Sequence, residues 1–341
     1  QPLNEFNLYL PDRGLQPLGR LRGFKSICVD KLNRKILYGT AGGEIGEIDI
    51  EKGTEVNDDV GPLVHSHFRD ELHGLCSHPL RQECITCGDD KTLRVWNLSA
   101  KRLATSIELP DIARCATFSP NGHLVAAGLG GELTNQARNP REHNGKVVII
   151  SYLQGELRIV HMVADAKDTV TSVLFTPDGS KLVCGSLDGK VYIYDALNNF
   201  QLVITLNGHK DEGIRHMDIS ENGKYLTTSG LRKELVVWDL TTGAKIESPD
   251  GRFEALATVG LEWSVRQSPL GISSVGVFPA FCDPANTLSI DQSKDATLLV
   301  SSDVFGGVKL FRNPSCQYFA PFKQFNAHSP GGVSKVTFTM E

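Results

Sequence analysis

The amino-acid sequence predicts an all-β protein built from repeated four-stranded units. Three observations lead to this prediction: short runs of strand composition recur along the 341 residues, tight-turn signals separate them, and equivalent positions are regularly spaced. Residues 208–239 show one unit in full, opening on Gly-His and closing on Trp-Asp. One four-stranded sheet cannot cover both of its own faces. The unit therefore predicts a ring of stacked sheets, a β-propeller of the WD40 type.

The residue before the closing Asp, or before its equivalent, locates each repeat. These residues are Ile48, Trp96, Ile150, Tyr194, Trp238 and Phe311. They are separated by 48, 54, 44, 44 and 73 residues, and a WD-type blade takes about 40–45 residues. Two of the steps therefore carry insertions. The turns P-N-G, P-D-G and E-N-G recur at matching places, where Asn-Gly and Asp-Gly accept the positive φ angles of tight hairpins.

We expect six recognisable blades and a partial seventh. Residues 1–23 are expected to be an N-terminal extension or a strand of a preceding propeller, and residues 24–341 the propeller itself. The blades are expected near residues 24–60, 70–110, 112–162, 168–207, 212–249 and 252–325, with the partial blade at 331–341. Because Gln1 is not an initiator Met and the chain stops inside an expected blade, we expect a segment of a larger protein.

A regular WD blade holds a buried hydrogen-bonded set. It comprises a His before the first strand, a Ser or Thr on the second, an Asp in the next turn and a Trp on the third. The predicted members are His67, Thr86, Asp90 and Trp96 in the second blade, Ser186 and Asp188 in the fourth, and His209, Ser229 and Trp238 in the fifth. Tyr194 replaces Trp in the fourth blade, and Arg232 stands at the Asp position of the fifth. Buried polar groups need partners, so these sets are interpreted as structural and not as catalytic.

Composition narrows the classes of function. The net charge of −5 and the pI near 6.1 argue against nucleic-acid binding driven by bulk charge. No apolar stretch reaches the roughly 18–20 residues of a membrane span, and no secretory signal is recognisable. The eight cysteines fall mostly in strand-like runs and are interpreted as small buried hydrophobes in a reducing compartment. Cys84 and Cys87 have C-x-x-C spacing, but residues three apart on a strand face opposite sides.

No motif points to catalysis. The run Gly128-Leu-Gly-Gly131 lacks the Gly-Lys-Ser/Thr of a phosphate loop and leads from a strand into a polar turn. Asp283, Asp291 and Asp295 lack calcium-loop spacing, and neither G-x-S-x-G nor H-E-x-x-H occurs. We therefore predict no enzymatic activity, no cofactor and no metal.

Several stretches go beyond the generic repeat. They are I-L-Y-G-T-A-G-G-E-I-G-E-I-D at 36–49, D-E-L-H-G-L-C-S-H-P at 70–79, T-C-G-D-D-K at 86–91, L-E-W at 261–263, G-V-F-P at 276–279, L-L-V-S-S-D at 298–303 and G-V-K-L-F-R-N-P at 307–314. Over nearly the whole chain this pattern resembles the echinoderm microtubule-associated protein-like family, with His73 where that family has Trp. The resemblance implies the second of two fused propellers, an irregular penultimate blade containing the L-E-W and G-V-F-P segments, and association with microtubules or soluble tubulin.

A partner is expected on the rim where the His-bearing loops and the Asp-bearing turns meet, since loops on a rigid scaffold often carry function. The third blade has an insertion in its Asp turn, residues 129–146. Acidic tubulin would suit a discontinuous basic patch on this rim. The candidate residues are Arg69, Arg138, Arg141, His143, Lys146, Lys210, Arg232 and Lys233. A solvated loop without a partner is the alternative for the insertion.

Three functions remain open after the sequence analysis. The first is a non-enzymatic scaffold that binds tubulin or microtubules and regulates microtubule organisation. It would be located in the cytoplasm at the cytoskeleton, including a cilium or spindle, with no nucleic-acid or membrane partner. The second is a general WD40 adaptor in a ciliary, signalling or ubiquitin-linked complex, sharing only the fold. The third is a propeller hydrolase or lyase, which would require acid and base residues converging in the central channel.

Overall fold

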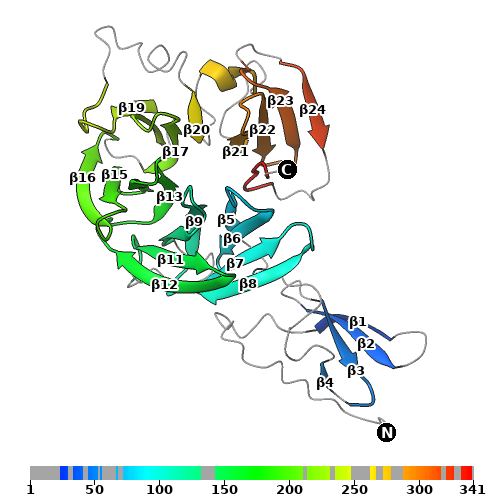
Figure 1. Cartoon of the computed structure of the whole chain (residues 1–341). Coiled ribbons are helices and arrows are strands. Elements are labelled where there is room, and N and C mark those ends of the chain that lie inside the picture. The colour runs from blue at the N-terminus through cyan, green and yellow to red at the C-terminus, as the bar shows by residue number, and fades with distance from the viewer. Residues whose placement is uncertain are drawn as a thin grey trace.

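Almost all regular structure in the protein is β-strand. The computed structural model (Figure 1) describes residues 24–29, 34–40, 45–52, 54–55, 67, 72–131, 143–209, 213–230, 235–246, 262–265, 272–277, 287–315, 320–325 and 332–339. Within these ranges the strands form six four-stranded antiparallel sheets, accompanied by one short 3-10 helix. The predicted all-β propeller architecture is confirmed.

In five of the six sheets, all but the fifth, neighbouring strands are consecutive in the chain. The first sheet comprises β1 (Phe24–Val29), β2 (Lys35–Thr40), β3 (Ile45–Asp49) and β4 (Thr54–Glu55), and the second β5 (Leu72–Ser77), β6 (Glu83–Gly88), β7 (Thr92–Asn97) and β8 (Arg102–Glu108). The third comprises β9 (Ala113–Phe118), β10 (Leu124–Leu129), β11 (Val147–Leu153) and β12 (Glu156–Val163), and the fourth β13 (Val170–Phe175), β14 (Lys181–Ser186), β15 (Lys190–Asp195) and β16 (Gln201–Asn207).

The fifth sheet departs from simple chain order. It comprises β17 (Ile214–Ser220), β18 (Tyr225–Gly230), β19 (Leu235–Asp239) and β20 (Trp263–Val265), in the order β19-β18-β17-β20. The sixth comprises β21 (Thr287–Gln292), β22 (Leu298–Asp303), β23 (Val308–Arg312) and β24 (Phe322–Phe325), and the helix η1 (Ile272–Val277) precedes it.

The residues used to align the repeats occupy one equivalent place in all six sheets. Each lies on the third strand opposite the second residue of the preceding strand. The pairs are Ile36 with Ile48, Cys84 with Trp96, Val125 with Ile150, Leu182 with Tyr194, Leu226 with Trp238 and Leu299 with Phe311. The predicted turns are also present: Gly122 and Gly179 both have φ of 71°, a conformation that glycine adopts without strain. The predicted register of the repeats is therefore confirmed.

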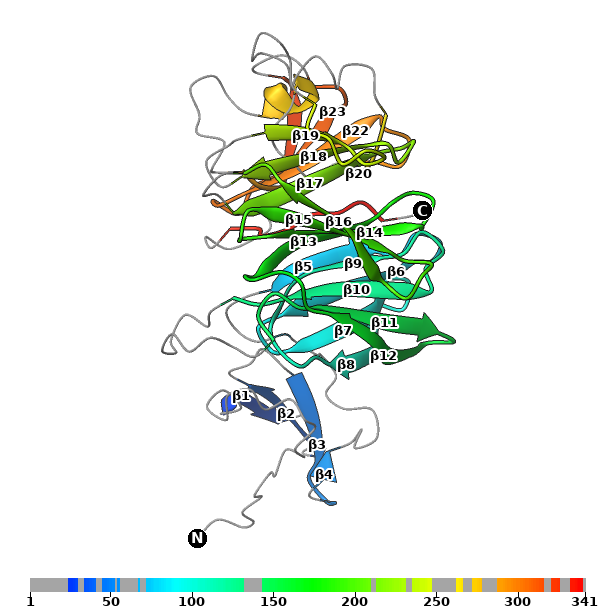
Figure 2. The ribbon, with the colours of Figure 1, turned by 90° about the vertical axis from the view of Figure 1, so that its left-hand side faces the viewer.

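The hydrophobic cores lie between sheets. One buried cluster joins residues of the second and third sheets, such as Leu93 and Ile150. Another joins the third and fourth sheets, and a further one joins the fourth and fifth, where Val191 packs with Trp238. Figure 1 shows these sheets and the sixth arranged around a common centre, and Figure 2 shows the same ring from its edge. The second to fifth sheets are therefore stabilised by their neighbours, as repeat architectures require.

The sheet of β1–β4 lies outside this ring in both views (Figures 1 and 2). We expected residues 24–60 to be the first blade of the same propeller, so their placement differs from the expectation. Ile27, Leu37 and Ile45 are 63%, 40% and 43% exposed, whereas Leu93, which matches Ile45 in register, is fully buried. A repeat pattern identifies a blade, but it does not say on which neighbours that blade stacks.

The L-E-W segment also lies elsewhere than expected. We assigned residues 252–325 to one blade, but β20 pairs with β17 of the fifth sheet, placing Ser220 opposite Trp263 and Ile219 opposite Val265. Val277 of η1 packs instead with Ile290, Leu299 and Phe311 of the sixth sheet. The long insertion is thus shared between two sheets, because the inner edge of β17 has free backbone groups that β20 can pair with.

The segment 332–339 connects the two sides of the opening in the ring. It was expected to begin a seventh blade, but it carries no assigned strand. The Ser334 hydroxyl donates to the Leu72 carbonyl of β5 at 2.9 Å, and the Phe338 amide donates to Asp291 of β21 at 2.7 Å. The Thr337 hydroxyl also donates to Asp291, at 2.9 Å. Side-chain contacts therefore hold this segment without a full strand ladder.

The Asp291 carboxyl group makes this connection sensitive to pH. Burial raises the pKa of Asp291 to about 6, although the Phe338 amide, the Thr337 hydroxyl and the Lys335 ammonium favour the ionised form. A folded-state pKa above the unfolded one means that the native protein binds the extra proton. Stability should therefore fall as the pH rises from about 4 to 6.

Asp291→Asn tests this dependence, because the amide keeps an acceptor for Phe338 but cannot ionise. We expect the melting temperature of the variant, relative to the native chain, to be higher at pH 7.5 than at pH 4.5. Differential scanning calorimetry at the two pH values measures the difference, and other titrating groups cancel because both proteins contain them. An equal difference at both pH values would contradict a buried, proton-linked carboxyl group.

Candidate functional site

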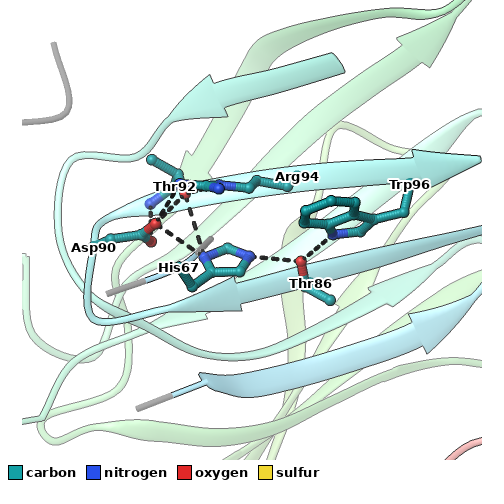
Figure 3. Close-up of polar contacts among 6 residues, drawn as sticks. All are labelled: His67, Thr86, Asp90, Thr92, Arg94 and Trp96. Carbon is teal, nitrogen blue, oxygen red and sulfur yellow. Dashed lines mark hydrogen bonds and ion pairs between the residues drawn. The ribbon is translucent and has the colours of Figure 1, made fainter. Parts of the chain in front are cut away.

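The second sheet contains a complete hydrogen-bonded set (Figure 3). His67 Nε2 lies 2.6 Å from the Thr86 hydroxyl oxygen, and the Trp96 indole N–H donates to the same oxygen at 2.6 Å. His67 Nδ1 lies 3.0 Å from Asp90. The structure thus brings all four predicted residues together, connecting the turn after β6 with β6 and β7.

Asp90 has further partners that sequence reasoning missed. The Thr92 hydroxyl donates to its carboxylate at 2.7 Å, and Arg94 forms an ion pair with it at 2.9 Å. Burial alone would raise the pKa of Asp90, but the hydrogen bond and charge of His67, together with Arg94, outweigh it and lower the pKa. Arg94 follows from spacing, since it lies two residues before Trp96 on the same face of β7.

The fifth sheet requires a correction of one residue. His209 Nε2 lies 2.7 Å from the Thr228 hydroxyl, and the Trp238 indole donates to Thr228 at 3.0 Å. Ser229, the predicted member, instead donates to the His216 carbonyl at 3.5 Å. Successive residues of a strand point to opposite faces, so a shift of one residue exchanges the side chain that meets the Trp. Arg232 lies outside the described residues.

The fourth sheet has a different set at the same positions. Asp188 accepts from the Tyr192 hydroxyl at 2.7 Å. Cys184 occupies the position of Thr86, and Tyr194 occupies the position of Trp96. Burial raises the pKa of the Tyr194 hydroxyl, and its hydrogen bond to Asp165 raises it further. Ser186 is not the Thr equivalent. It lies two residues farther along β14 and donates to the Asp168 carbonyl at 2.9 Å.

Two of the predicted rim residues are described. Lys146 Nζ lies 3.1 Å from His143 Nδ1, and both side chains are half-buried at the end of the third-blade insertion. The other candidates lie outside the residues that the structure describes: Arg69, Arg138, Arg141, Lys210, Arg232 and Lys233. A basic rim patch therefore stays a prediction.

A cluster that the sequence did not reveal lies on the innermost strands. His73 of β5 contacts Arg114 of β9, and each lies 3.3 Å from Asp89 in the turn after β6. Asp89 is 2% exposed. Arg114 Nε also donates to the Gly130 carbonyl at 3.1 Å. These contacts link the second and third sheets at the end where the Asp-bearing turns lie.

The opposite end of the innermost strands lines a partly open pocket of about 330 Å³. Leu75, Phe118 and Leu174 contribute to its walls, and the segment 335–339 closes one side. Asp291 and Lys335 bring opposite charges into it. Since Asp291 already accepts hydrogen bonds from the segment, the pocket is part of the contact that holds residues 332–339.

Cys84 and Cys87, the pair with C-x-x-C spacing, are buried free thiols. Burial raises the pKa of Cys84 to about 11 and that of Cys87 still more, so both thiols are protonated at neutral pH. Among the described residues, no group of three or more His, Cys, Asp or Glu side chains is placed to hold a metal ion. No helix within the described ranges is long and apolar enough to cross a membrane.

Three features together define a WD-repeat β-propeller. Four-stranded sheets are arranged around a centre, and one core position is equivalent in every sheet. Two of the sheets also contain a His-Thr-Trp hydrogen-bonded set. Residues 72–341 match the family described as the echinoderm microtubule-associated protein second β-propeller. The chain belongs to this family. The matched region begins at β5, the first strand of the ring.

The relatives are described as microtubule-associated proteins. The chain is 30% identical over 279 residues to echinoderm microtubule-associated protein-like 2 of Mus musculus, which is 81% of this chain and 39% of that protein. It is 29% identical over 311 residues to echinoderm microtubule-associated protein-like 3 of Homo sapiens, which is 90% of this chain and 32% of that protein. It is 27% identical over 293 residues to echinoderm microtubule-associated protein-like 4 of Mus musculus, which is 85% of this chain and 27% of that protein. The chain thus spans about a third of the length of these relatives.

Thr228→Val and Ser229→Ala test the corrected set in the fifth sheet. Thr228→Val keeps the shape but leaves the buried Trp238 N–H and His209 without their shared partner, so we expect a loss of about 1–3 kcal/mol. Ser229→Ala removes one long hydrogen bond and should cost less than about 1 kcal/mol. Urea denaturation followed by Trp fluorescence measures both. A larger loss for Ser229→Ala would restore the original assignment.

Proposed function

We propose that this propeller is a non-enzymatic module that binds tubulin or microtubules and contributes to microtubule organisation in the cytoplasm. The observation that carries the proposal is the match of residues 72–341 to a second propeller of microtubule-associated proteins. The named relatives, which the chain matches over 81–90% of its own length, support it. Cilium and spindle are the microtubule structures that we would examine first.

A rigid scaffold suits such a role. Buried clusters join neighbouring sheets of the ring, so docking should cost little conformational entropy in the scaffold itself. Affinity would then come from a few aromatic and Arg anchors on one rim. The rim candidates are the basic residues of the His-bearing loops and Asp-bearing turns, which suit an acidic partner.

The second candidate function is a general adaptor in a multiprotein complex. The fold favours it, because WD-type propellers serve many unrelated partners. One measurement distinguishes the two functions. Salt-sensitive binding to αβ-tubulin is expected if the chain binds tubulin, and is not expected if it is a general adaptor. A hydrolase or lyase is the least favoured alternative, because the polar groups of the blades pair with one another in structural sets.

The first experiment is binding of the purified chain to soluble αβ-tubulin at low and at physiological ionic strength. We expect binding that weakens as salt rises, because exposed charge pairs are screened. Absence of binding at both ionic strengths would favour the adaptor function for this segment.

Arg138→Glu with Arg141→Glu tests the contribution of the third-blade insertion. We expect the double variant to bind tubulin more weakly, since two positive charges facing an acidic partner become negative. The melting temperature should stay unchanged. Lys101→Glu with Arg102→Glu is the matched control, because both residues are exposed at the outer edge of the second sheet. Equal binding by the Arg138/Arg141 variant and this control would remove the insertion from the interface.

A further inference from the structure

The outermost strands of the second, third and fourth sheets carry a β-bulge at one equivalent place. In β12, Ile159 and His161 pair with successive residues of β11, and Val160 between them has no pairing partner. The same irregularity isolates one residue in β8 and one in β16. A bulge bends its strand and re-aims a side chain. The bulged residues are Ala104, Val160 and Val203.

In the third and fourth sheets this position is apolar and exposed. Val160 is 55% and Val203 is 53% exposed, and the residues before them, Ile159 and Leu202, are 43% and 42% exposed. The second sheet has only the small residue Ala104 at its bulge. Four large apolar side chains are therefore exposed on two outer strands, and we call these four residues the perimeter patch.

The two halves of the perimeter patch adjoin. The ring of His161, the residue after Val160, stacks on the ring of Phe200, and the ring centroids are 5.9 Å apart. Phe200 belongs to the buried cluster between the third and fourth sheets and lies two residues before Leu202. Figure 1 shows β12 and β16 on the outside of neighbouring sheets. Single exposed apolar residues are ordinary, whereas a contiguous patch marks an interaction surface.

Charged residues are rare around the perimeter patch. Residues 153–163 and 197–207, which span β12, β16 and the turns before them, contain two charged residues, Glu156 and Arg158. The whole chain is 22% charged, so these stretches have fewer than half the charges that their length predicts. Glu156 and Arg158 are exposed and form an ion pair at 2.7 Å. Depletion of charge is typical of the core of a protein–protein interface.

This surface is complementary to a second copy of itself. A two-fold symmetric contact joins identical surfaces, so a favourable one needs opposite charges in equal number. The perimeter patch is uncharged and is bordered by one carboxylate and one guanidinium. Across a two-fold axis, Glu156 of one copy can face Arg158 of the other while the apolar side chains meet. Homodimer interfaces are also more apolar than the interfaces of transient complexes.

We propose that two copies of this chain associate through the perimeter patch in a two-fold symmetric dimer. The four apolar residues of each copy lie at the centre of the contact, and Glu156 and Arg158 lie at its border. With so few large side chains, the contact falls at the small end of specific interfaces, and the association is reversible. It leaves the rims open, so that one dimer presents the rim surfaces of two rings.

Side-chain packing, and not the pairing of strand edges, holds this dimer. A bulge in an edge strand is one of the features that prevent edge-to-edge pairing. Both β12 and β16 are bulged within the patch, so neither offers a flat edge to another strand. The association therefore depends on the side chains of Val160 and Val203, which are the sites to change.

Sedimentation velocity of the 341-residue chain over about 1–300 μM, a range that covers weak association, is the direct measurement. We expect a monomer–dimer equilibrium. Val160→Glu and Val203→Glu should each weaken it by about tenfold or more, because a carboxylate would be buried without a partner. Ala104→Glu is the matched control, since it adds the same charge at the equivalent bulge of β8. It should dimerise like the native chain, and all three variants should keep the native melting temperature.

Exchange of the border charges tests the two-fold symmetry and leaves the apolar residues intact. Glu156→Arg leaves two positive charges at the border and Arg158→Glu leaves two negative ones. Each variant alone should dimerise about twofold to tenfold more weakly. An equimolar mixture should recover the native association, because opposite charges then meet across the contact. Weakening that the mixture does not relieve would contradict the two-fold arrangement.

Three further results would overturn the proposal. The first is a native chain that stays monomeric over the whole concentration range. The second is a dimer that Ala104→Glu weakens as much as Val160→Glu does. The third is growth beyond two copies, which indicates a head-to-tail contact in place of a closed dimer. Because no tubulin is present in these measurements, their outcome is independent of the proposed function, and either one can fail while the other stands.

Discussion

The architecture depends on the requirement that each four-stranded sheet bury both faces against other sheets. Three buried clusters of the ring are each shared by two neighbouring sheets, and they contain fully buried residues such as Leu93 and Val191. The first sheet shows the same requirement in reverse, since Ile27 remains 63% exposed where no sheet of the ring covers it. The stacking of the sheets therefore determines where the strands of the ring lie, and the strands in turn determine the positions of the polar side chains.

The hydrogen-bonded sets are secondary to this stacking. The second sheet has the full His-Thr-Asp-Trp set, the fifth is described with Thr228 between His209 and Trp238, and the fourth uses Tyr194 with Asp165. The third sheet has Ala127 at the Thr position and Ile150 at the Trp position, yet both are fully buried. Apolar packing alone thus suffices for one blade, while the polar sets fix the loops on the rim.

Periodic features could be predicted from the sequence, and features that break the period could not. Trp96, Tyr194 and Phe311 were aligned correctly because their spacing follows the repeat. Thr228 could also have been predicted, because it lies ten residues before Trp238 as Thr86 lies ten residues before Trp96; the adjacent hydroxyl residue Ser229 was chosen in its place. The partners of β20 and the bulges at Arg114 and Arg215 depend on contacts between strands that are distant in the chain, so no local pattern marks them.

The contact between Ser334 and Leu72 joins residues 262 positions apart. During synthesis at about 5–20 residues per second, β5 emerges from the ribosome on the order of 15–50 s before the segment that lies beside it. Throughout that interval β5 can pair with β6 but lacks its contact with this segment. A chaperone that shields β5 while translation continues would therefore influence the yield of folded protein more than one that acts after release.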